Sequence, residues 1–487
     1  IYYSDSVVKA TFDILTYLDF TLFRRTFCKI LHFLGALSCA IQKKAVSLQP
    51  KSLNNHCNMK RYALNQLKAW KDQPNRKPLI LQGARQVGKT WLMKQFAKEC
   101  FEHSVYINFE NNQLLAHLFE KDFDIDRILL ELQIATRETI TPNTLLLFDE
   151  IQEVKRGVTA LKYFYELRPE QPIIAAGSLL GIAMHRDDSF PVGKVDFMTL
   201  YPLSFCEFAE AMGEELLIKQ VKQQNWSLIT SHAPQLEDLL RKYYYIGGMP
   251  EVVNAFVQNT DFVQVRTIQQ AILDSYDRDF SKHAPINEVP RIRMVWRSAI
   301  GQLAKENKKF IYGFLKKGAR AKEFELALSW LQDAGLVYKV HRTKTTKLPL
   351  SAYEDFSAFK LYLLDVGLLG ALSGVSEQVL LQKNELMSEF KGALTEQYVM
   401  QQLRCNRQNI IYYWSQETSQ GEIDFLVQQG DRILPVEVKA EDNLQAKSLK
   451  WFVENNKELH GVRFSMSGYR EQDWITNYPL YTVEAVL

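Results

Sequence analysis

Apolar and polar positions along residues 59–205 predict a sheet of parallel strands. Five runs rich in apolar residues are each long enough for one strand; they span 78–83, 104–109, 144–150, 171–178 and 195–200. The first run leads through a loop into a helical segment at 91–100. Strands connected through helices build α/β folds. We therefore expect an α/β protein that begins with a doubly wound parallel sheet.

The pattern becomes helical after Leu203. Two further helical segments then precede apolar runs at 336–342 and 359–364, which predict strands. Helix, helix, strand, loop and strand is the order of a winged helix. We therefore predict a core domain over 59–205, a helical lid over 206–290, and a winged-helix-like domain with a linker over 291–385.

The last hundred residues predict a further domain, 386–487. Its expected elements are a helix at 388–403, strands at 410–414, 421–427 and 433–439, a helix at 446–455 and a strand at 461–467. The predicted order of elements is therefore αβββαβ.

The first 58 residues differ from the rest of the chain. The first methionine is Met59, and an aromatic-rich stretch at 11–41 is interrupted by charged residues. The charge order is not that of a signal peptide, because the basic residues follow the apolar part. We interpret 1–58 as a non-native or disordered N-terminal extension. An amphipathic helix on a membrane surface is the alternative.

Composition and charge exclude several classes of protein. The 487 residues are 46% hydrophobic and 24% charged, which is typical of a soluble globular chain. The net charge is +3, but residues 1–58 carry +4 and the remainder −1, so the bulk charge requires no nucleic-acid partner. No apolar window is long enough to span a membrane. The six cysteines form no CxxC pair, which argues against a disulfide scaffold or a zinc site and favours the cytoplasm.

The loop after the first predicted strand fits the phosphate-binding pattern GxxxxGK[ST]. It consists of Gly83, Ala84, Arg85, Gln86, Val87, Gly88, Lys89 and Thr90. The two glycines let successive backbone N–H groups face one anion at the start of a helix. Lys89 would reach the β- and γ-phosphates of ATP, and the Thr90 hydroxyl would ligate Mg²⁺.

A strand that ends in two acidic residues completes the predicted nucleotide site. Asp149 would hold Mg²⁺ through water, and Glu150 would polarise the attacking water. Two polar residues end neighbouring strands. Asn108 could hold Glu150 in an inactive position, and Ser178 could contact the attacking water or the γ-phosphate. The alternative for both is a turn residue that bonds its own backbone.

Five strings in the sequence resemble a bacterial and archaeal family of AAA-type ATPases. They are GARQVGKT, LLLFDEIQ, AAGSLLG, FPVGKVDFMTLYPLSFCEF and YYYIGGMPEVV. The resemblance runs from about Met59 to the end, and it implies an AAA-like core, a helical lid and a C-terminal domain of unknown function. The arginine finger that such enzymes take from a neighbouring subunit stays unassigned among Arg186, Lys194 and Arg278, and a homo-oligomer stays open.

A second group of candidate catalytic residues lies in the C-terminal part of the chain. Asp424 and the Glu437–Lys439 pair resemble the D…ExK pattern of the PD-(D/E)XK nuclease superfamily, which has a restriction-endonuclease-like fold. Alternation in a strand places Glu437 and Lys439 on one face. Asp424 and Glu437, with Glu396 from the preceding helix, would hold Mg²⁺, while Lys439 would activate the water. The alternative is a retained fold that binds without cutting.

These observations lead to two functional hypotheses. The first is an ATPase whose nucleotide state gates a nuclease-like domain acting on DNA. The second is a non-cutting ATP-dependent switch, in which wing and tail only bind nucleic acid or a protein. A local basic cluster near the predicted wing is the candidate DNA contact; it comprises Lys316, Lys317, Arg320, Lys322, Arg342, Lys344 and Lys347.

Overall fold

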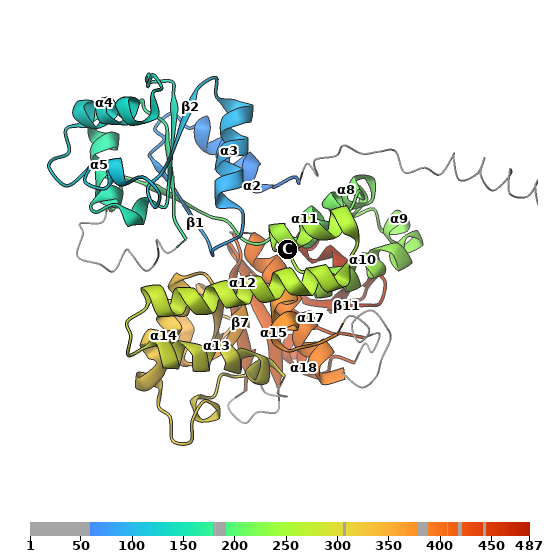
Figure 1. Ribbon diagram of the computed structural model, residues 1–487. Helices are drawn as coiled ribbons and strands as arrows, with labels where there is room; N and C mark the ends of the chain where they lie inside the picture. The colour runs from blue at the N-terminus through green and yellow to red at the C-terminus, as the bar shows by residue number, and fades with distance from the viewer. Residues whose placement is uncertain are drawn as a thin grey trace, which may run out of the picture. The chain divides into compact units, whose positions relative to one another are not determined.

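A computed structural model gives the structure of the chain (Figure 1). It describes residues 59–178, 181, 191–304, 308–376, 388–406, 408–416, 421–441 and 445–487. The expected N-terminal extension, 1–58, lies outside the described residues, as does Arg186. None of the helices in the described ranges has the length and apolar character that a membrane crossing needs.

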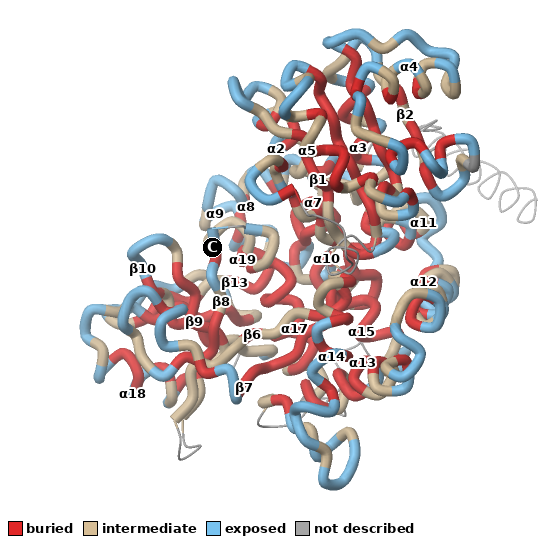
Figure 2. Tube along the Cα trace, turned by 90° about the vertical axis from the view of Figure 1, so that its left-hand side faces the viewer, coloured by how far each residue is buried: buried red, intermediate tan, exposed pale blue. Residues whose placement is uncertain are grey.

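The first sheet has five parallel strands in the order β2-β3-β4-β1-β5. Its strands are β1 (Leu79–Gln82), β2 (Ser104–Asn108), β3 (Leu145–Asp149), β4 (Ile173–Ala176) and β5 (Asp196–Thr199). Each coincides with one of the apolar runs. Figure 2 shows β1 largely buried, and every residue of β3 is buried. The expected parallel sheet is therefore confirmed.

Helices cover both faces of this sheet. They are α2 (Ala63–Lys71), α3 (Lys89–Cys100), α4 (Ile125–Thr136) and α5 (Gly157–Leu167), and Figure 1 shows α2 and α3 on the opposite side from α4 and α5. Leu79 and Leu81 belong to the hydrophobic core that also contains Phe96 of α3, whereas Ile80 belongs to the core of Ile128 and Leu161. Alternate residues of β1 thus pack against the helices on opposite faces of the sheet, as in a doubly wound sheet.

Helices then follow without a strand as far as residue 303. They are α7 (Phe205–Ala211), α8 (Glu215–Lys222), α9 (Trp226–Ser231), α10 (Ala233–Ile246), α11 (Pro250–Asn259), α12 (Phe262–His283) and α13 (Val289–Leu303). Ser204 begins the series with a capping box, in which its hydroxyl accepts from the backbone of Glu207. Gly248 fits against the chain at Leu203, where an added Cβ would lie 2.1 Å from the carbonyl oxygen.

A second sheet has eight strands in the order β12-β13-β11-β10-β9-β8-β6-β7. They are β6 (Val337–Thr343), β7 (Glu354–Leu363), β8 (Ile410–Ser415), β9 (Glu422–Gln429), β10 (Arg432–Val438), β11 (Gly461–Ser465), β12 (Arg470–Glu471) and β13 (Ile475–Pro479). The helices around it are α14 (Ala321–Asp333), α15 (Val366–Leu372), α17 (Ser388–Cys405), α18 (Lys447–Asn455) and α19 (Val483–Val486).

This sheet crosses the position where the sequence predicted a domain boundary, between 385 and 386. The expected helix, helix, strand and strand are present as α13, α14, β6 and β7. However, β6 pairs in parallel with β8 through Arg342–Tyr413 and Thr343–Trp414, so β6 and β7 share one sheet with the strands that follow residue 386. The pairing joins residues about 70 positions apart, which no local pattern reveals.

Candidate functional site

The phosphate-binding loop connects β1 to α3, and its glycines have a steric reason. Gly83 has φ +141°, and a Cβ there would lie 2.3 Å from the carbonyl oxygen of Leu200. Gly88 has φ +95° and is the N-cap of α3. Gln86 also has a positive φ, 68°. Because both glycines adopt backbone angles that side chains disfavour, the loop curls around one point at the helix N-terminus.

Lys89 is buried within this loop. Its Nζ donates hydrogen bonds to the carbonyl oxygens of Gly83 at 2.8 Å and Ala84 at 2.9 Å. Burial lowers the pKa of Lys89 to about 8, although the charges of Glu150 and Asp149 oppose the shift. The ammonium therefore lies at the loop that the sequence assigned to phosphate, and among the described residues its hydrogen bonds go to neutral carbonyl oxygens.

Thr90 and Asp149 meet at the carboxyl end of the sheet. The Thr90 hydroxyl donates to Oδ2 of Asp149 at 2.7 Å, and the Tyr106 hydroxyl donates to the same oxygen at 2.8 Å. A hydroxyl and a carboxylate are the hard oxygen ligands that Mg²⁺ prefers. The residues predicted for Mg²⁺ are thus brought together and fit it. Tyr106 is a further neighbour that the sequence did not single out.

Glu150 is held by Ser178, not by Asn108. Oγ of Ser178 donates to Oε1 of Glu150 at 2.8 Å, its backbone N–H donates to Oε2 at 3.1 Å, and Gln152 donates to Oε2 at 2.6 Å. Burial would raise the pKa of Glu150, but these hydrogen bonds outweigh it and lower the pKa. Asn108 instead accepts from the backbone N–H of Glu110, so it has the turn role that was the alternative.

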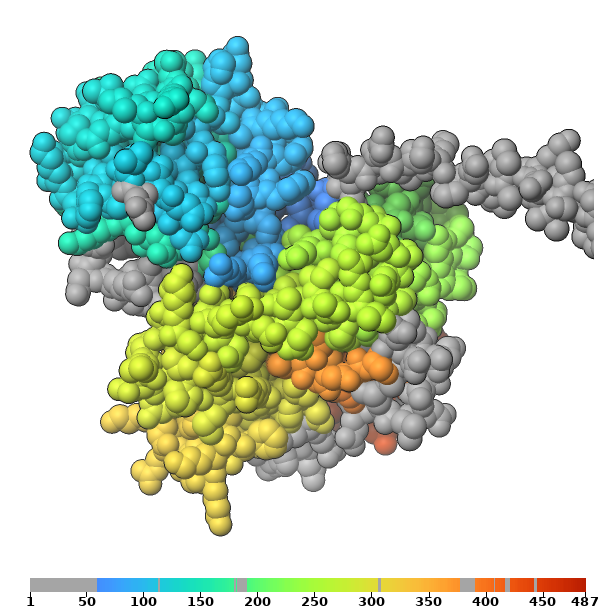
Figure 3. Space-filling view, viewed as in Figure 1, coloured from blue at the N-terminus to red at the C-terminus, as the bar shows by residue number. Residues whose placement is uncertain are grey.

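The helical region contacts the loop from outside. Arg85 forms an ion pair with Asp279 of α12 at 2.8 Å, and the Tyr276 hydroxyl of the same helix donates to the Arg85 carbonyl at 2.9 Å. In Figure 3 the yellow-green surface of α12 adjoins the blue surface of the loop segment. The buried Arg61 donates to the carbonyl oxygen of Val87 at 3.0 Å. Sequence reasoning missed these contacts because they join distant segments.

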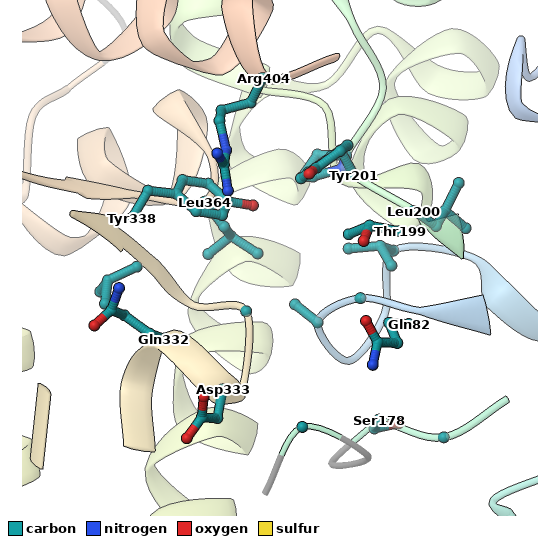
Figure 4. Close-up of a pocket in the computed structure, with 18 of the residues that line it drawn as sticks. Gln82, Ser178, Thr199, Leu200, Tyr201, Gln332, Asp333, Tyr338, Leu364 and Arg404 are labelled. Carbon is teal, nitrogen blue, oxygen red and sulfur yellow. The ribbon is translucent and has the colours of Figure 1, made fainter. Parts of the chain in front are cut away.

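A cavity of about 470 Å³ lies beside the loop (Figure 4). The first sheet and the segments that follow its strands contribute Gln82, Gly83, Ala84, Ser178, Thr199 and Leu200. The later part of the chain contributes Gln332, Asp333, Tyr338, Lys339 and Arg404. The guanidinium of Arg404 lies over the Tyr338 ring, 4.9 Å from its centroid. Residues from α14, β6 and α17 therefore face the segments that end the nucleotide-site strands.

The described candidates for an arginine finger have local partners. Lys194 pairs with Glu166 at 3.1 Å, and Arg278 donates to the carbonyl oxygen of Asp274 at 3.2 Å, one turn earlier on its own helix. Neither contact reaches the phosphate-binding loop.

In the C-terminal part, Asp424 and Glu437 lie on the neighbouring strands β9 and β10. Oδ2 of Asp424 accepts from the backbone N–H of Val438 at 2.8 Å, and Lys439 pairs with Glu437 at 2.6 Å. Burial, with the nearby Glu396 and Glu437 charges, raises the pKa of Asp424 to about 7; burial also raises the pKa of Glu437. The D…ExK residues thus cluster with one another, as their spacing predicted.

Glu396, the expected third ligand, is bound by cations instead. Oε1 of Glu396 lies 3.1 Å from Nζ of Lys360, Oε2 pairs with Lys308, and the Tyr362 hydroxyl donates to Oε1. Burial would raise the pKa of Glu396, but the two lysines outweigh it and hold the pKa at about 2. Within the described ranges, no group of three or more His, Cys, Asp or Glu side chains has an arrangement suited to a metal ion. The predicted set of ligands stays a prediction.

Sequence reasoning missed Lys360. It is fully buried in β7, within the apolar string FKLYLL, and this string is the signal that could have found it. Lysine is almost never fully buried without a charged partner, so a lone lysine inside an apolar strand predicts a buried carboxylate nearby.

Residues 75–209 match the model of the AAA domain. Two domains of unknown function match further along, DUF8612 over residues 237–379 and DUF4143 over residues 391–483. No curated protein matches the chain. The core is thus an AAA-type P-loop domain.

Three solved structures that match this chain share little sequence identity with it. The Walker-type ATPase of Pyrococcus abyssi is 15% identical, covers 65% of this chain and 96% of its own, and has a TM-score of 0.42. The RuvB Holliday junction branch migration motor of Thermotoga maritima is 15% identical, with coverages of 61% and 93% and a TM-score of 0.26. The Orc1 protein of Aeropyrum pernix, solved in complex with DNA, is 11% identical, with coverages of 66% and 95% and a TM-score of 0.25.

Proposed function

We propose that this chain binds and hydrolyses ATP and that its nucleotide state switches how the helical and C-terminal parts bind a partner. The observation that carries this proposal is that the two charged groups of the site, Lys89 and Glu150, already have hydrogen-bond partners within the protein. Lys89 bonds to loop carbonyls and Glu150 bonds to Ser178, so both groups must exchange partners when ATP binds and reacts. The Lys89 exchange takes place in the loop that α12 also contacts.

In the proposed mechanism the loop binds ATP through its backbone N–H groups and Lys89. Gly83 and Gly88 permit the curl, while Ala84, Arg85, Gln86 and Val87 supply the backbone between them. The Lys89 ammonium leaves the two carbonyl oxygens and binds the β- and γ-phosphates. The exchange is favourable because charge-assisted hydrogen bonds are stronger than those to neutral acceptors.

Thr90 and Asp149 would hold Mg²⁺, since their oxygens already lie 2.7 Å apart at this point. When bound, the metal neutralises charge on the phosphates. Glu150 is the base that takes a proton from the attacking water, and it must first leave Ser178. In this mechanism Ser178 restrains the base in the resting site.

The cavity supports the proposed coupling. Arg404 of α17 and Lys339 of β6 line it together with Gly83 and Ser178, so the C-terminal part borders both the loop and the residue that restrains Glu150. We infer that a change at Ser178 or the loop alters the packing of α14, β6 and α17 against this cavity.

The partner that we propose is DNA, bound through the wing and the C-terminal part, with a homo-oligomer as the working assembly. Six members of the basic cluster are exposed, namely Lys316, Lys317, Arg320, Lys322, Lys344 and Lys347. The guanidinium of Arg342 pairs with Asp355 at 2.6 Å, so we do not count it among the residues that would contact DNA. A protein partner is the alternative occupant of the same surface.

The second candidate function is the gated nuclease. The observation that favours it is the clustering of Asp424, Glu437 and Lys439 on and just after the neighbouring strands β9 and β10. In that case a plasmid or duplex is cut with divalent metal, ATP changes the rate, and Lys439→Ala abolishes cutting.

The test of the ATP site compares Lys89→Ala with Glu150→Gln. We expect Lys89→Ala to lose ATP affinity in a fluorescent-nucleotide titration. Glu150→Gln should keep affinity but lose turnover by a factor of about 100 or more, the usual contribution of a general base. Lys98→Ala, an exposed lysine on the same helix, is the control and should match the wild type. ATP binding by Lys89→Ala at wild-type strength would overturn the assignment.

The test of the switch uses the Glu150→Gln variant, which should retain ATP. Its affinity for duplex DNA is measured by fluorescence anisotropy with ATP, with ADP and without nucleotide. A change in affinity of about tenfold between the states supports a DNA-binding switch. Equal affinities in all three states contradict it.

A further inference from the structure

A lysine ammonium lies among the carboxylates of the C-terminal centre. Nζ of Lys360 is 2.5 Å from an oxygen of Glu422, 3.1 Å from Glu396 and 3.9 Å from Asp424. These carboxylates come from β9 and α17, while the lysine comes from β7. One buried cation therefore joins three elements at the point where the D…ExK resemblance leads one to expect a divalent metal.

Lys360 is fully buried at this position. Its side chain is 0% exposed, and Glu396 is 1% exposed. The Lys360 Nζ also lies over the Tyr413 ring of β8, 5.1 Å from its centroid. A side chain that is enclosed on all sides and paired with carboxylates is a fixed part of the fold, unlike an exposed lysine that moves aside for a ligand.

The remaining charges of the centre are also paired. Lys308 binds Glu396, and Lys439 binds Glu437. Four carboxylates are thus set against three ammonium groups, namely Glu396, Glu422, Asp424 and Glu437 against Lys308, Lys360 and Lys439. Carboxylates that converge on one point usually need a cation between them, and here the chain supplies it.

A divalent metal does not fit this arrangement. Mg²⁺ requires near-octahedral oxygen ligands at short distances, and Mn²⁺ takes similar oxygen ligands. The oxygens of Glu396 and Glu422 that would supply them already accept from Lys360. A second cation placed among the same carboxylates would also be repelled by the buried ammonium, with little solvent to screen the two charges.

We propose that Lys360 is a built-in cation that replaces the metal of the nuclease-like centre, so that this part of the chain binds its partner without metal-dependent cutting. The chain has the D…ExK residues, but Lys360 of β7 occupies the point on which the carboxylates converge. This inference concerns the C-terminal centre alone and does not depend on ATP hydrolysis at the P-loop.

The experiment measures Mn²⁺ binding to the full chain without nucleotide, by electron paramagnetic resonance of free Mn²⁺. The single variant Asp424→Asn should bind the same amount of Mn²⁺ as the wild type, because we expect the wild-type centre to hold no Mn²⁺. Lys360→Ala should bind one additional Mn²⁺ per chain, and adding Asp424→Asn to that variant should remove it. Lys360→Arg keeps the charge and should bind no additional ion.

Two results would overturn the proposal. One is loss of a bound Mn²⁺ from the wild type on Asp424→Asn, which would show that metal binds beside Lys360. The other is a folded Lys360→Ala chain that binds no additional ion. If Lys360→Ala fails to fold, the wild-type comparison still decides. ATP turnover by the same samples, measured separately, tests the proposed function, so failure of one proposal is distinguishable from failure of the other.

Discussion

At the scale of single residues, the nucleotide site was largely predictable because its chemistry is local in sequence. The strand, the two glycines, Lys89 and Thr90 follow one another, and the spacing alone fixes their geometry. The partner of Glu150 was not predictable. Asn108 and Ser178 end different strands, and only the strand order β2-β3-β4-β1-β5 determines which side chain faces Glu150. The sequence analysis gave this role to Asn108 and placed Ser178 near the attacking water, whereas in the structure Ser178 holds the carboxylate.

Ser178→Ala should raise basal ATP hydrolysis. The variant removes the hydroxyl that donates to Oε1 of Glu150, so the base reaches the attacking water at a lower cost. A hydrogen bond to a charged group contributes about 1.5–3 kcal/mol, so we expect an increase of about tenfold or more, with ATP affinity unchanged. Phosphate release at saturating ATP measures the rate. A tenfold decrease would instead mean that Ser178 contacts the water or the γ-phosphate.

At the scale of elements, α12 is one of the helices that contact the phosphate-binding loop. Asp279→Asn removes its ion pair with Arg85 while leaving the Tyr276 bond to the loop backbone. We expect ATP affinity to change by less than about threefold, because partly exposed pairs contribute about 0.2–1 kcal/mol. ATP-dependent protection of α12 in hydrogen exchange should weaken. Asp274→Asn, on the exposed side of the same helix, is the control. Equal protection of α12 in both variants would mean that the Arg85–Asp279 ion pair does not couple the loop to this helix.

The β6–β7 pair has an acid-sensitive contact of its own. Asp355 accepts from Arg342 and from Ser357; burial opposes these bonds, but they lower the pKa of Asp355 from 3.8 to about 2. A depressed pKa stabilises the fold at pH values above 3.8, and this stabilisation is lost as the pH falls through about 2. Asp355→Asn should therefore lower the urea midpoint at pH 7, and the difference from the wild type should shrink in acid. A difference that stays constant down to pH 2 would contradict this role.

At the scale of the whole molecule, the sequence predicted the C-terminal elements as far as β11. It did not predict β12, β13 and α19, nor the sheet that the strands share. Apolar runs located β6 to β11 to within a few residues, except that β7 begins five residues before its run. The joining of β6 to β8 rests on two residue pairs distant in sequence, and Lys360 of β7 meets Glu396 of α17 through a tertiary contact between segments 36 residues apart. Chemistry within one motif was therefore accessible from the sequence, whereas the cation that completes the second centre required the tertiary fold.

The shared sheet makes a final prediction about residues 388–487. Expressed alone, this segment would expose the edge of β8 that β6 covers, and unpaired strand edges favour aggregation. It would also leave Glu396 without Lys308, Lys360 and Tyr362, and an unpaired buried carboxylate is strongly destabilising, by about 3–5 kcal/mol. We expect the fragment to be aggregated or to lack a cooperative thermal transition by circular dichroism.

A longer fragment, 308–487, is the matched control for this prediction. It restores β6, β7 and the three partners of Glu396, and should show more ordered structure and a steeper transition than 388–487. Lys360→Met in the longer fragment should remove most of that gain, because the buried carboxylates then lack their cation while the side-chain volume is nearly kept. A short fragment that melts cooperatively at the temperature of the longer one would mean that residues 388–487 fold as a separate domain. The continuity of the sheet would then contribute little to their stability.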